Sequence, residues 1–476
     1  MKQQDKMAVL PVYKATQMKR IAVLTAGGDT PALNATISGV VARANQLRVE
    51  VIGIIKGFNG LLNPEVPHVH LNPLYATIPE LDSTLGGTIL GASRDYISSD
   101  DKETTALAAS RLAKLKVDGL VCIGGDGTLN GMQALADLIP VVLAPKTIDN
   151  DLGLNYLDEQ DEWIRDPDTT HKKGYQYRMR AGREFTLDEM VNYVTPGFAT
   201  AVYVSASNVQ RIRTTAESHR RIAIVEVMGR DCGMIALGAS YGQPDMILVP
   251  ESPVDPEPLV NKLVSLLDYQ KHAVIVVSEG IVDKDGLPYG SVSASQDPSG
   301  NFQYSGAAEA IKRLFVKELG NEFFTRKRRN ESADAAIFIR KIGHTQRGGR
   351  PISFDRYYAQ QLGGKAVDLL MDGQHNVVAT LQYRDKGFYL DSCTANSLRD
   401  RWGVIHARPL SKKFYDSKRF KPSNLGVEYL HSIFHNALSE GDVESGRSLF
   451  DSAHLHRPFH SVNVDINKRI HRLPVE

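Results

Sequence analysis

The chain has 476 residues, 42% of them hydrophobic, so it can bury more than one core, and two domains are the default expectation. Its 56 basic residues nearly balance its 55 acidic ones and form no long basic stripe, which argues against nucleic acid as a partner. The three cysteines are too few and scattered for a disulfide framework, and no apolar run spans a bilayer, so we expect a cytoplasmic protein without a membrane partner.

The first twenty residues have no apolar core of signal-peptide length, and we expect them to form a short leading arm. A strand-like run at 21–25 then ends in AGGDTPALNA, and a helix-like run at 35–47 precedes a second strand at 51–55. Strand, glycine turn, helix and strand in this order form a βαβ unit. Gly27 and its neighbour would stand where a phosphate can meet the start of the helix.

The most informative stretch runs from residue 119 to 151. Two apolar runs of strand length, 120–123 and 141–144, each end in a polar cluster, and in a parallel α/β sheet both clusters emerge at the same carboxyl edge. The clusters consist of Gly124, Gly125, Asp126, Gly127 and Thr128 on one side and Thr147, Asp149 and Asp151 on the other. The glycines allow a backbone to approach phosphate, and the following helix offers its first NH groups to an anion.

The carboxylates of these clusters suit phosphoryl transfer. Asp126 can hold Mg²⁺, while Asp149 and Asp151 offer one group to accept a proton and another to organise the metal. A Gly-Asp-Gly sequence is also a common turn, and residues 147–151 alone are compatible with a solvated loop. Two such clusters after buried strands, about twenty residues apart, favour the functional interpretation.

Residues 152–194 are charged and show little sustained periodicity, which indicates an insertion. It carries a cluster of basic residues, Lys172, Lys173, Arg178, Arg180 and Arg183. A lid over the neighbouring site, a subunit-contact arm and a solvated loop all remain open for this segment.

The second half of the chain repeats the pattern of buried strands that end in polar clusters. Arg221, Arg230 and Glu279 fall at strand borders, where side chains face a cleft more often than a core. His344 and Arg347 share one turn and suit a sugar phosphate, because they combine a compact cation with a forked donor. A long helix then returns to the first domain. We can assign no chemistry to the basic stretch after residue 398, and we expect this tail to pack on another subunit.

Six motifs in this order resemble those of the 6-phosphofructokinase family, of the phosphofructokinase A type. They are TAGGDTPALNATI, GGTILGASR, GGDGT, PKTIDND, VEVMGRDCG and GHTQRGG. The resemblance implies an α/β fold of two Rossmann-like domains with mostly parallel sheets and the active site in the cleft between them. It also implies phosphorylation of fructose 6-phosphate at the 1-hydroxyl with Mg²⁺ and ATP in glycolysis, by a homotetramer or homodimer. The expected domains are 18–155 with about 348–400, and 156–347 with about 401–476.

The family's site residues carry over by position. The catalytic residues would be Thr147, Asp149, Asp151 and Arg230, with Asp126 and Asp151 as metal ligands. The phosphoryl donor would contact Gly27, Arg94, Gly125, Asp126, Gly127, Thr128 and Lys146. Fructose 6-phosphate would contact Thr147, Asp149, Arg221, Met228, Gly229, Arg230, Glu279, Arg340, His344 and Arg347. The family's arginine six residues before the histidine is Phe338 here, and Arg340 is the nearest substitute.

Two positions give opposite indications about the phosphoryl donor. In the family, glycine after the GGD aspartate leaves space for ATP, as Gly127 does here, whereas Lys146 resembles the pyrophosphate-dependent members. We give Gly127 more weight, because a side chain at this position would exclude ATP, whereas an added lysine only increases the attraction for a phosphate. A pyrophosphate-dependent enzyme, a kinase for another ketose phosphate and a silent regulatory paralogue are the alternatives. The intact Asp126, Asp149 and Arg230 argue against the last.

Overall fold

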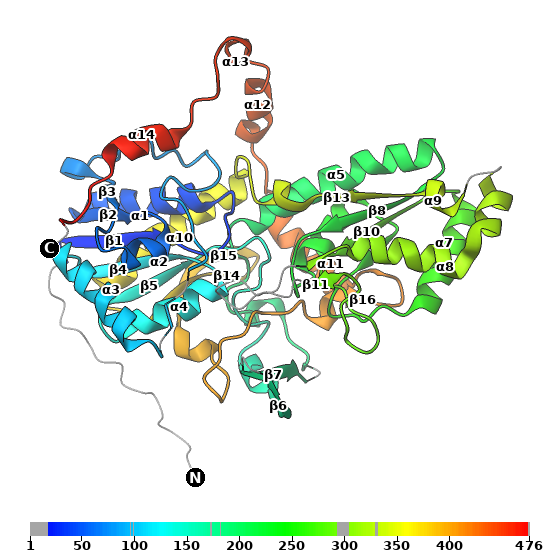
Figure 1. The fold of residues 1–476 in the computed structure, drawn as a ribbon, viewed down its shortest axis with the longest axis horizontal. Coiled ribbons are helices and arrows are strands. Elements are labelled where there is room, and N and C mark those ends of the chain that lie inside the picture. Colours follow the sequence, from blue (N-terminus) through cyan, green and yellow to red (C-terminus); the bar gives the residue numbers. More distant parts are fainter. Residues whose placement is uncertain are drawn as a thin grey trace.

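The computed structural model describes residues 18–474, apart from 96, 99, 172–173, 181, 293–303 and 329–331. The expected leading arm, residues 1–17, and two lysines of the insertion, Lys172 and Lys173, lie outside the described residues. Two separate sheets lie side by side, each with helices packed on its faces (Figure 1).

The first sheet has seven strands. Their order is β15 (Gly387–Thr394), β14 (Val377–Arg384), β5 (Val141–Pro145), β4 (Gly119–Gly124), β1 (Arg20–Thr25), β2 (Glu50–Ile54) and β3 (His68–His70). The five inner strands are parallel and the two edge strands antiparallel. Every residue of β4 and β5 is buried, as expected of parallel strands covered on both faces.

Helices cover both faces of this sheet. α1 (Leu33–Leu47) and α10 (Ser353–Met371) pack on one face, and α2 (Gly57–Leu62), α3 (Lys102–Lys114) and α4 (Asp126–Ala136) pack on the other. The backbones of α1 and α10 approach so closely that a Cβ on Gly39 would lie 2.0 Å from the carbonyl oxygen of Gln360. Glycine is therefore required where the helix from the second half of the chain returns to the first sheet.

The second sheet is parallel throughout. Its order is β13 (Ile337–Lys341), β8 (Ile222–Val227), β10 (Ala273–Ser278) and β9 (Met246–Leu248). α5 (Phe198–Ser218) and α6 (Met234–Gly238) cover one face, while α7 (Pro256–Tyr269), α8 (Ala307–Arg328) and α9 (Ala333–Ala336) cover the other. A small hairpin of β11 (Ser291–Val292) and β12 (Tyr304–Ser305) flanks it. These two sheets confirm the predicted α/β class.

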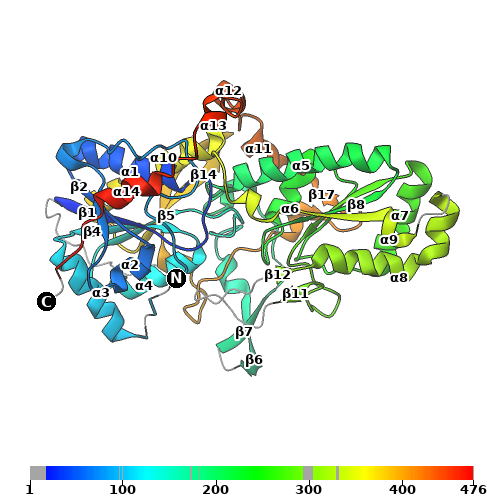
Figure 2. The ribbon, with the colours of Figure 1, turned by 45° about the horizontal axis from the view of Figure 1, so that its top comes forward.

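The charged segment after the first sheet forms a hairpin of β6 (Trp163–His171) and β7 (Gly174–Met179) that projects from the body (Figures 1 and 2). A bridge between Leu154 and Val191 closes its base. Trp163 stacks on His406 of the later chain at 4.0 Å between ring centroids. The hairpin is thus held at its root by the C-terminal segment.

The C-terminal segment visits both sheets. β16 (Tyr415–Asp416), β17 (Lys421–Pro422) and α11 (Asn424–Phe434) lie with the second sheet, and α12 (Glu440–Ser448) and α13 (Ala453–His456) form an arm that projects beyond the body (Figure 1). α14 (Val462–Arg469) instead packs beside β3 of the first sheet, where Arg469 pairs with Glu80 at 2.7 Å. The sequence placed all of 401–476 in the second domain, whereas its last part lies on the first.

Candidate active site

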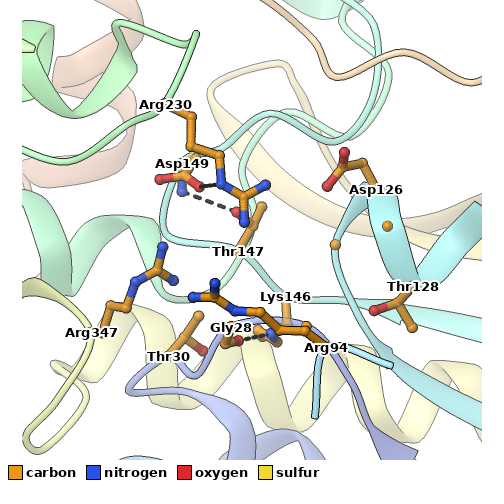
Figure 3. Close-up of a pocket in the computed structure, with 13 residues that line it drawn as sticks. Gly28, Thr30, Arg94, Asp126, Thr128, Lys146, Thr147, Asp149, Arg230 and Arg347 are labelled. Carbon is orange, nitrogen blue, oxygen red and sulfur yellow. Dashed lines mark hydrogen bonds and ion pairs between the residues drawn. The ribbon is translucent and has the colours of Figure 1, made fainter. Parts of the chain in front are cut away.

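The carboxyl ends of β1, β4 and β5 open into one pocket with an empty volume of about 430 Å³ (Figure 3). Its lining residues are Gly27, Gly28, Thr30, Arg94, Gly125, Asp126, Gly127, Thr128, Lys146, Thr147, Asp149, Arg230 and Arg347. All except Thr30 were placed at the site by the sequence, Gly28 as the neighbour of Gly27 in the first glycine turn. The arrangement brings four cationic side chains together with two carboxylates, a composition suited to a polyanion.

Two glycine turns shape one wall of this pocket. Gly27 follows β1 with φ of +79°, a conformation that favours glycine. A Cβ on Gly124 would lie 1.9 Å from Thr128 Oγ1, so only glycine lets the end of β4 pack against the start of α4. The first turn of α4 contains Asp126, Gly127 and Thr128, all on the pocket wall, where its free backbone NH groups can meet an anion.

Lys146 is hydrogen-bonded to the first of these turns. Its ammonium is buried and donates hydrogen bonds to the carbonyl oxygens of Ala26, at 3.2 Å, and Gly28. Burial, together with the positive charge of Arg347, lowers the pKa of Lys146 to about 7. Its Nζ therefore has backbone partners within the protein.

The loop after β5 supplies the carboxylates. The backbone NH of Asp149 donates to Thr147 Oγ1 at 3.1 Å, and Arg230 Nε lies 3.9 Å from Asp149 Oδ2 (Figure 3). Asp149 Oδ1 and Asp151 Oδ1 are buried and find no hydrogen-bond partner among the described residues. Burial raises the pKa of Asp151, and the negative charges of Asp126 and Asp149 raise it as well.

These carboxylates fit the Mg²⁺ that the family resemblance implies. Unpartnered buried oxygens and mutual repulsion are both relieved by a cation at this place. Within the described part of the chain, no three acidic, histidine or cysteine side chains converge on one point as a complete metal cage would require. Mg²⁺ is commonly held by one or two carboxylates together with substrate phosphates, so Asp126 and Asp151 suffice as candidate protein ligands.

The turn after β8 brings Arg230 into the pocket. Glu279 Oε1 accepts hydrogen bonds from the backbone NH groups of Gly229, at 3.3 Å, and Arg230, at 3.1 Å. Gln346 Oε1 accepts from the backbone NH of Met228 at 3.0 Å. Burial raises the pKa of Glu279 to about 7. Glu279 and Gln346 thus fix the backbone that directs Arg230 at Asp149.

Six of the predicted sugar-phosphate residues do not line the pocket: Arg221, Met228, Gly229, Glu279, Arg340 and His344. Met228, Gly229 and Glu279 belong to the support of Arg230 just described, and the other three lie elsewhere. Arg221 precedes β8, at the opposite end of the strand from Arg230, and six strand residues span about 20 Å. Arg340 is exposed on β13, and His344 is exposed on the turn after it. Neither belongs to the residues lining the pocket. Their assignment to the sugar phosphate stays a prediction.

The sequence interpretation missed two residues that the structure places at the site. Thr30 lines the pocket, and the turn AGGDT that contains it was the available signal. Gln346 is fully buried between Met228 and Ser205, whose Oγ accepts from its side-chain amide at 3.0 Å. A single glutamine between His344 and Arg347 carries no local sign of this role.

The sequence profile of the family described as Phosphofructokinase matches residues 20–156 and 188–370, which together are more than half of the chain. The chain belongs to the phosphofructokinase family. This confirms the resemblance seen in the six motifs. The interval between the two matched segments lies within the stretch that the sequence marked as an insertion.

The sequences of curated relatives align with this phosphofructokinase over most of its length. It is 34% identical over 363 residues to the ATP-dependent 6-phosphofructokinase of Staphylococcus carnosus, covering 75% of this chain and 87% of the relative. It is 35% identical over 373 residues to ATP-dependent 6-phosphofructokinase 2 of Streptomyces coelicolor, covering 77% and 92%.

Solved structures share the fold. The pyrophosphate-dependent phosphofructokinase of Nitrosospira multiformis superposes with a TM-score of 0.66 at 18% identity, covering 89% of this chain and 93% of that one. Phosphofructokinase of Saccharomyces cerevisiae gives a TM-score of 0.57 at 21% identity, covering 79% and 44%. Together with the two sheets described above, these likenesses confirm the two-domain α/β architecture of the phosphofructokinase.

Proposed function

We propose that this phosphofructokinase transfers the γ-phosphoryl group of ATP to the 1-hydroxyl of fructose 6-phosphate, yielding fructose 1,6-bisphosphate and ADP. The observation that carries the proposal is the placement of Asp149 beside Arg230, at the end of a pocket whose other wall is the glycine-lined start of α4. The curated relatives named above are ATP-dependent 6-phosphofructokinases, which supports the same donor and acceptor.

The residues divide the reaction between them. Asp149 accepts the proton of the 1-hydroxyl as its oxygen bonds to the γ-phosphorus and the bond from that phosphorus to ADP breaks. Arg230 and Arg94 neutralise charge that develops on the transferring group. Mg²⁺, when held by Asp126 and Asp151, would screen the charge of the donor phosphates. Thr147 orients the loop through its bond to the backbone of Asp149.

The surroundings of Gly127 and Lys146, the two positions that indicate the phosphoryl donor, favour ATP. Gly127 belongs to the first turn of α4 and lines the pocket without a side chain that would fill it. The ammonium of Lys146 is engaged by the carbonyl oxygens of Ala26 and Gly28. A lysine with backbone partners contributes less attraction to pyrophosphate than a free ammonium would.

Comparing kcat/KM for ATP and pyrophosphate at saturating Mg²⁺ and fructose 6-phosphate tests this function, and a second series varies the ketose phosphate with ATP held constant. We expect a clear preference for ATP and for fructose 6-phosphate. A preference for pyrophosphate would overturn the donor assignment, a preference for another ketose phosphate would overturn the acceptor, and no turnover with any pair would indicate a regulatory paralogue.

Arg347 should hold the phosphate of the acceptor. Its guanidinium lies across the pocket from Asp126 and Thr128 (Figure 3), which places it away from the start of α4. We expect Arg347→Ala to raise KM for fructose 6-phosphate about 10- to 100-fold, in the range for loss of a charged hydrogen bond, and KM for ATP much less. Arg350→Ala, three residues on and exposed, is the matched control. Equal effects on both Michaelis constants would contradict the assignment.

We also propose that the chain forms homo-oligomers, with the arm of α12 and α13 as one contact. Five apolar side chains on this arm and its flanks are 71–94% exposed: Val443, Leu449, Phe450, Leu455 and Phe459. In the described structure, neither α12 nor α13 buries any of its residues, and such short helices are not stable alone in water. The five side chains expose on the order of 700 Å². Two copies covering each other's arms would bury on the order of 1,400 Å², within the range of stable interfaces.

A double variant of the arm tests this contact. We expect Phe450→Ser with Phe459→Ser to lower the oligomeric state measured by analytical ultracentrifugation at micromolar concentration. Val427→Ser removes an exposed apolar side chain of α11, outside the arm, and should leave the state unchanged. An arm variant that sediments as the unmodified protein does would show that the interface lies elsewhere.

A further inference from the structure

A residue far along the chain reaches the loop that carries the proposed catalytic base. Arg408 lies beyond residue 370, where the match to the family profile ends, yet its side chain is only 2% exposed. Its guanidinium donates to the carbonyl oxygens of Asn150, at 2.7 Å, and Asn192, at 2.8 Å. Its backbone NH donates to the carbonyl oxygen of Asp151 at 2.6 Å. The carbonyl oxygens of two consecutive loop residues, Asn150 and Asp151, therefore both accept hydrogen bonds from Arg408.

A second residue of the C-terminal segment holds the same loop from its side chain. Asn150 donates to the hydroxyl of Tyr429, in α11, at 2.6 Å, and that hydroxyl donates to the carbonyl oxygen of Tyr193 at 2.9 Å. The amide oxygen of Asn150 accepts from the backbone NH of Thr195 at 3.0 Å. Asn150, which stands between Asp149 and Asp151, is thus bonded through its carbonyl oxygen and through both polar atoms of its side chain.

The backbone of the loop needs such support. Asn150 has a backbone φ of +57°, in the left-handed region that residues other than glycine adopt at a cost in free energy. The peptide on either side of this residue sets the direction of Asp149 and Asp151. Because a buried guanidinium and a buried tyrosine hydroxyl must both keep their partners, the contacts at Asn150 resist rotation of these peptides.

We propose that Arg408 and Tyr429 are positioning residues for phosphoryl transfer: they hold Asn150 so that Asp149 meets the acceptor hydroxyl and Asp151 faces the donor phosphates. The proposal rests on the function proposed above and extends the site to a segment that the family profile does not include. Neither residue lines the pocket, so neither touches substrate in this role. Loss of their contacts should act on the rate of transfer and not on affinity, because a displacement of about 1 Å costs about 100-fold in rate.

The neighbours of Arg408 make a clean test feasible. The backbone NH of Leu410 donates to Glu251 at 2.7 Å, and the carbonyl oxygen of Pro409 accepts from Asn155 at 3.1 Å. These bonds keep the segment in place when the side chain of Arg408 is changed. Tyr429→Phe removes only the hydroxyl and retains the ring that stacks on Phe414 at 4.8 Å between centroids.

The variants are Arg408→Lys, Arg408→Met and Tyr429→Phe, with Tyr415→Phe as the matched control. Tyr415 belongs to the same C-terminal segment, and its hydroxyl also donates to a backbone carbonyl, that of Ile247 in β9, away from the catalytic loop. We expect Arg408→Met and Tyr429→Phe to lower kcat about 10- to 100-fold while KM for ATP and fructose 6-phosphate changes less than about threefold. Arg408→Lys should retain more activity than Arg408→Met, and Tyr415→Phe should keep kcat.

A second readout does not depend on turnover. Amide hydrogen exchange of the 147–152 segment should accelerate in Tyr429→Phe and stay unchanged in Tyr415→Phe. If the unmodified protein proves inactive with every acceptor, the proposed function fails. Accelerated exchange in Tyr429→Phe would then still show that Tyr429 holds the loop in place. Unchanged exchange, a fall in kcat that Tyr415→Phe shares, or a rise in KM with normal kcat would each overturn the positioning role.

Discussion

Replacing Asp149 with serine should lower kcat by about 10²–10⁴-fold, the usual worth of a general base. Asp149 is buried at the end of the pocket, one carboxylate oxygen faces Arg230 at 3.9 Å, and the other has no partner in the described part of the protein. Serine is smaller and cannot take the proton at neutral pH. The change removes the acceptor of the hydroxyl proton without adding bulk or charge to the site.

Steady-state kinetics with ATP and fructose 6-phosphate would measure this loss, and a binding assay for ATP would show that the pocket stays intact. Asp231→Ser is the matched control, because Asp231 directly follows Arg230 but is bonded by the hydroxyl of Tyr304 at 2.6 Å and does not line the pocket. A variant Asp149→Ser with near-normal kcat would refute the role of this carboxylate.

Gly127→Asp should lower kcat/KM for ATP by about 10²–10³-fold and spare any latent use of pyrophosphate. The new carboxylate would stand in the first turn of α4, on the pocket wall. Two unit charges about 4 Å apart repel by about 4 kcal/mol at an effective dielectric constant of 20, which corresponds to about 10³-fold. The side chain also fills space that the nucleotide must pass.

Asn130→Asp provides the control for charge. Asn130 lies one turn later on α4 and outside the pocket lining, and its substitution adds the same negative charge to the same helix. Lys146→Gly is the reciprocal variant and should cost pyrophosphate more than ATP. It should also slow both reactions, because it releases the bonds to Ala26 and Gly28. If Gly127→Asp used ATP as well as the unmodified protein does, a side chain at this position would not exclude the nucleotide, and the steric argument would be wrong.

The central site could be predicted because its signals are local. β4 and β5 are continuous buried runs that end in polar residues, and parallel strands bring their carboxyl ends to one edge, so Asp126 and Asp149 had to lie near each other. The glycines carry the same information, since the positive φ of Gly27 favours glycine and a Cβ on Gly124 would clash with Thr128. These patterns, together with the six motifs, are sufficient for the fold and for the pocket.

Long-range contacts left no such trace. Arg408 is one arginine among several in a basic stretch, and only the folded chain shows that its side chain is buried on the catalytic loop. Arg221 was assigned from its place at a strand border, yet β8 separates it from Arg230. The hairpin of β6 and β7 arises from a segment without sustained periodicity, and its two strands pair with each other.

The return of α10, β14 and β15 to the first sheet has a consequence for synthesis of the protein. β1, β4 and β5 have been synthesised by residue 145, but α10, which covers much of one face of their sheet, ends only at Met371. At about 5–20 residues per second, that helix follows about 10–45 s later. During this interval α1 is present on this face, but the part of β4 and β5 that α10 covers, including Val121 and Val142, lacks its packing partner. The nascent first domain therefore stays incomplete until almost four-fifths of the chain has been made.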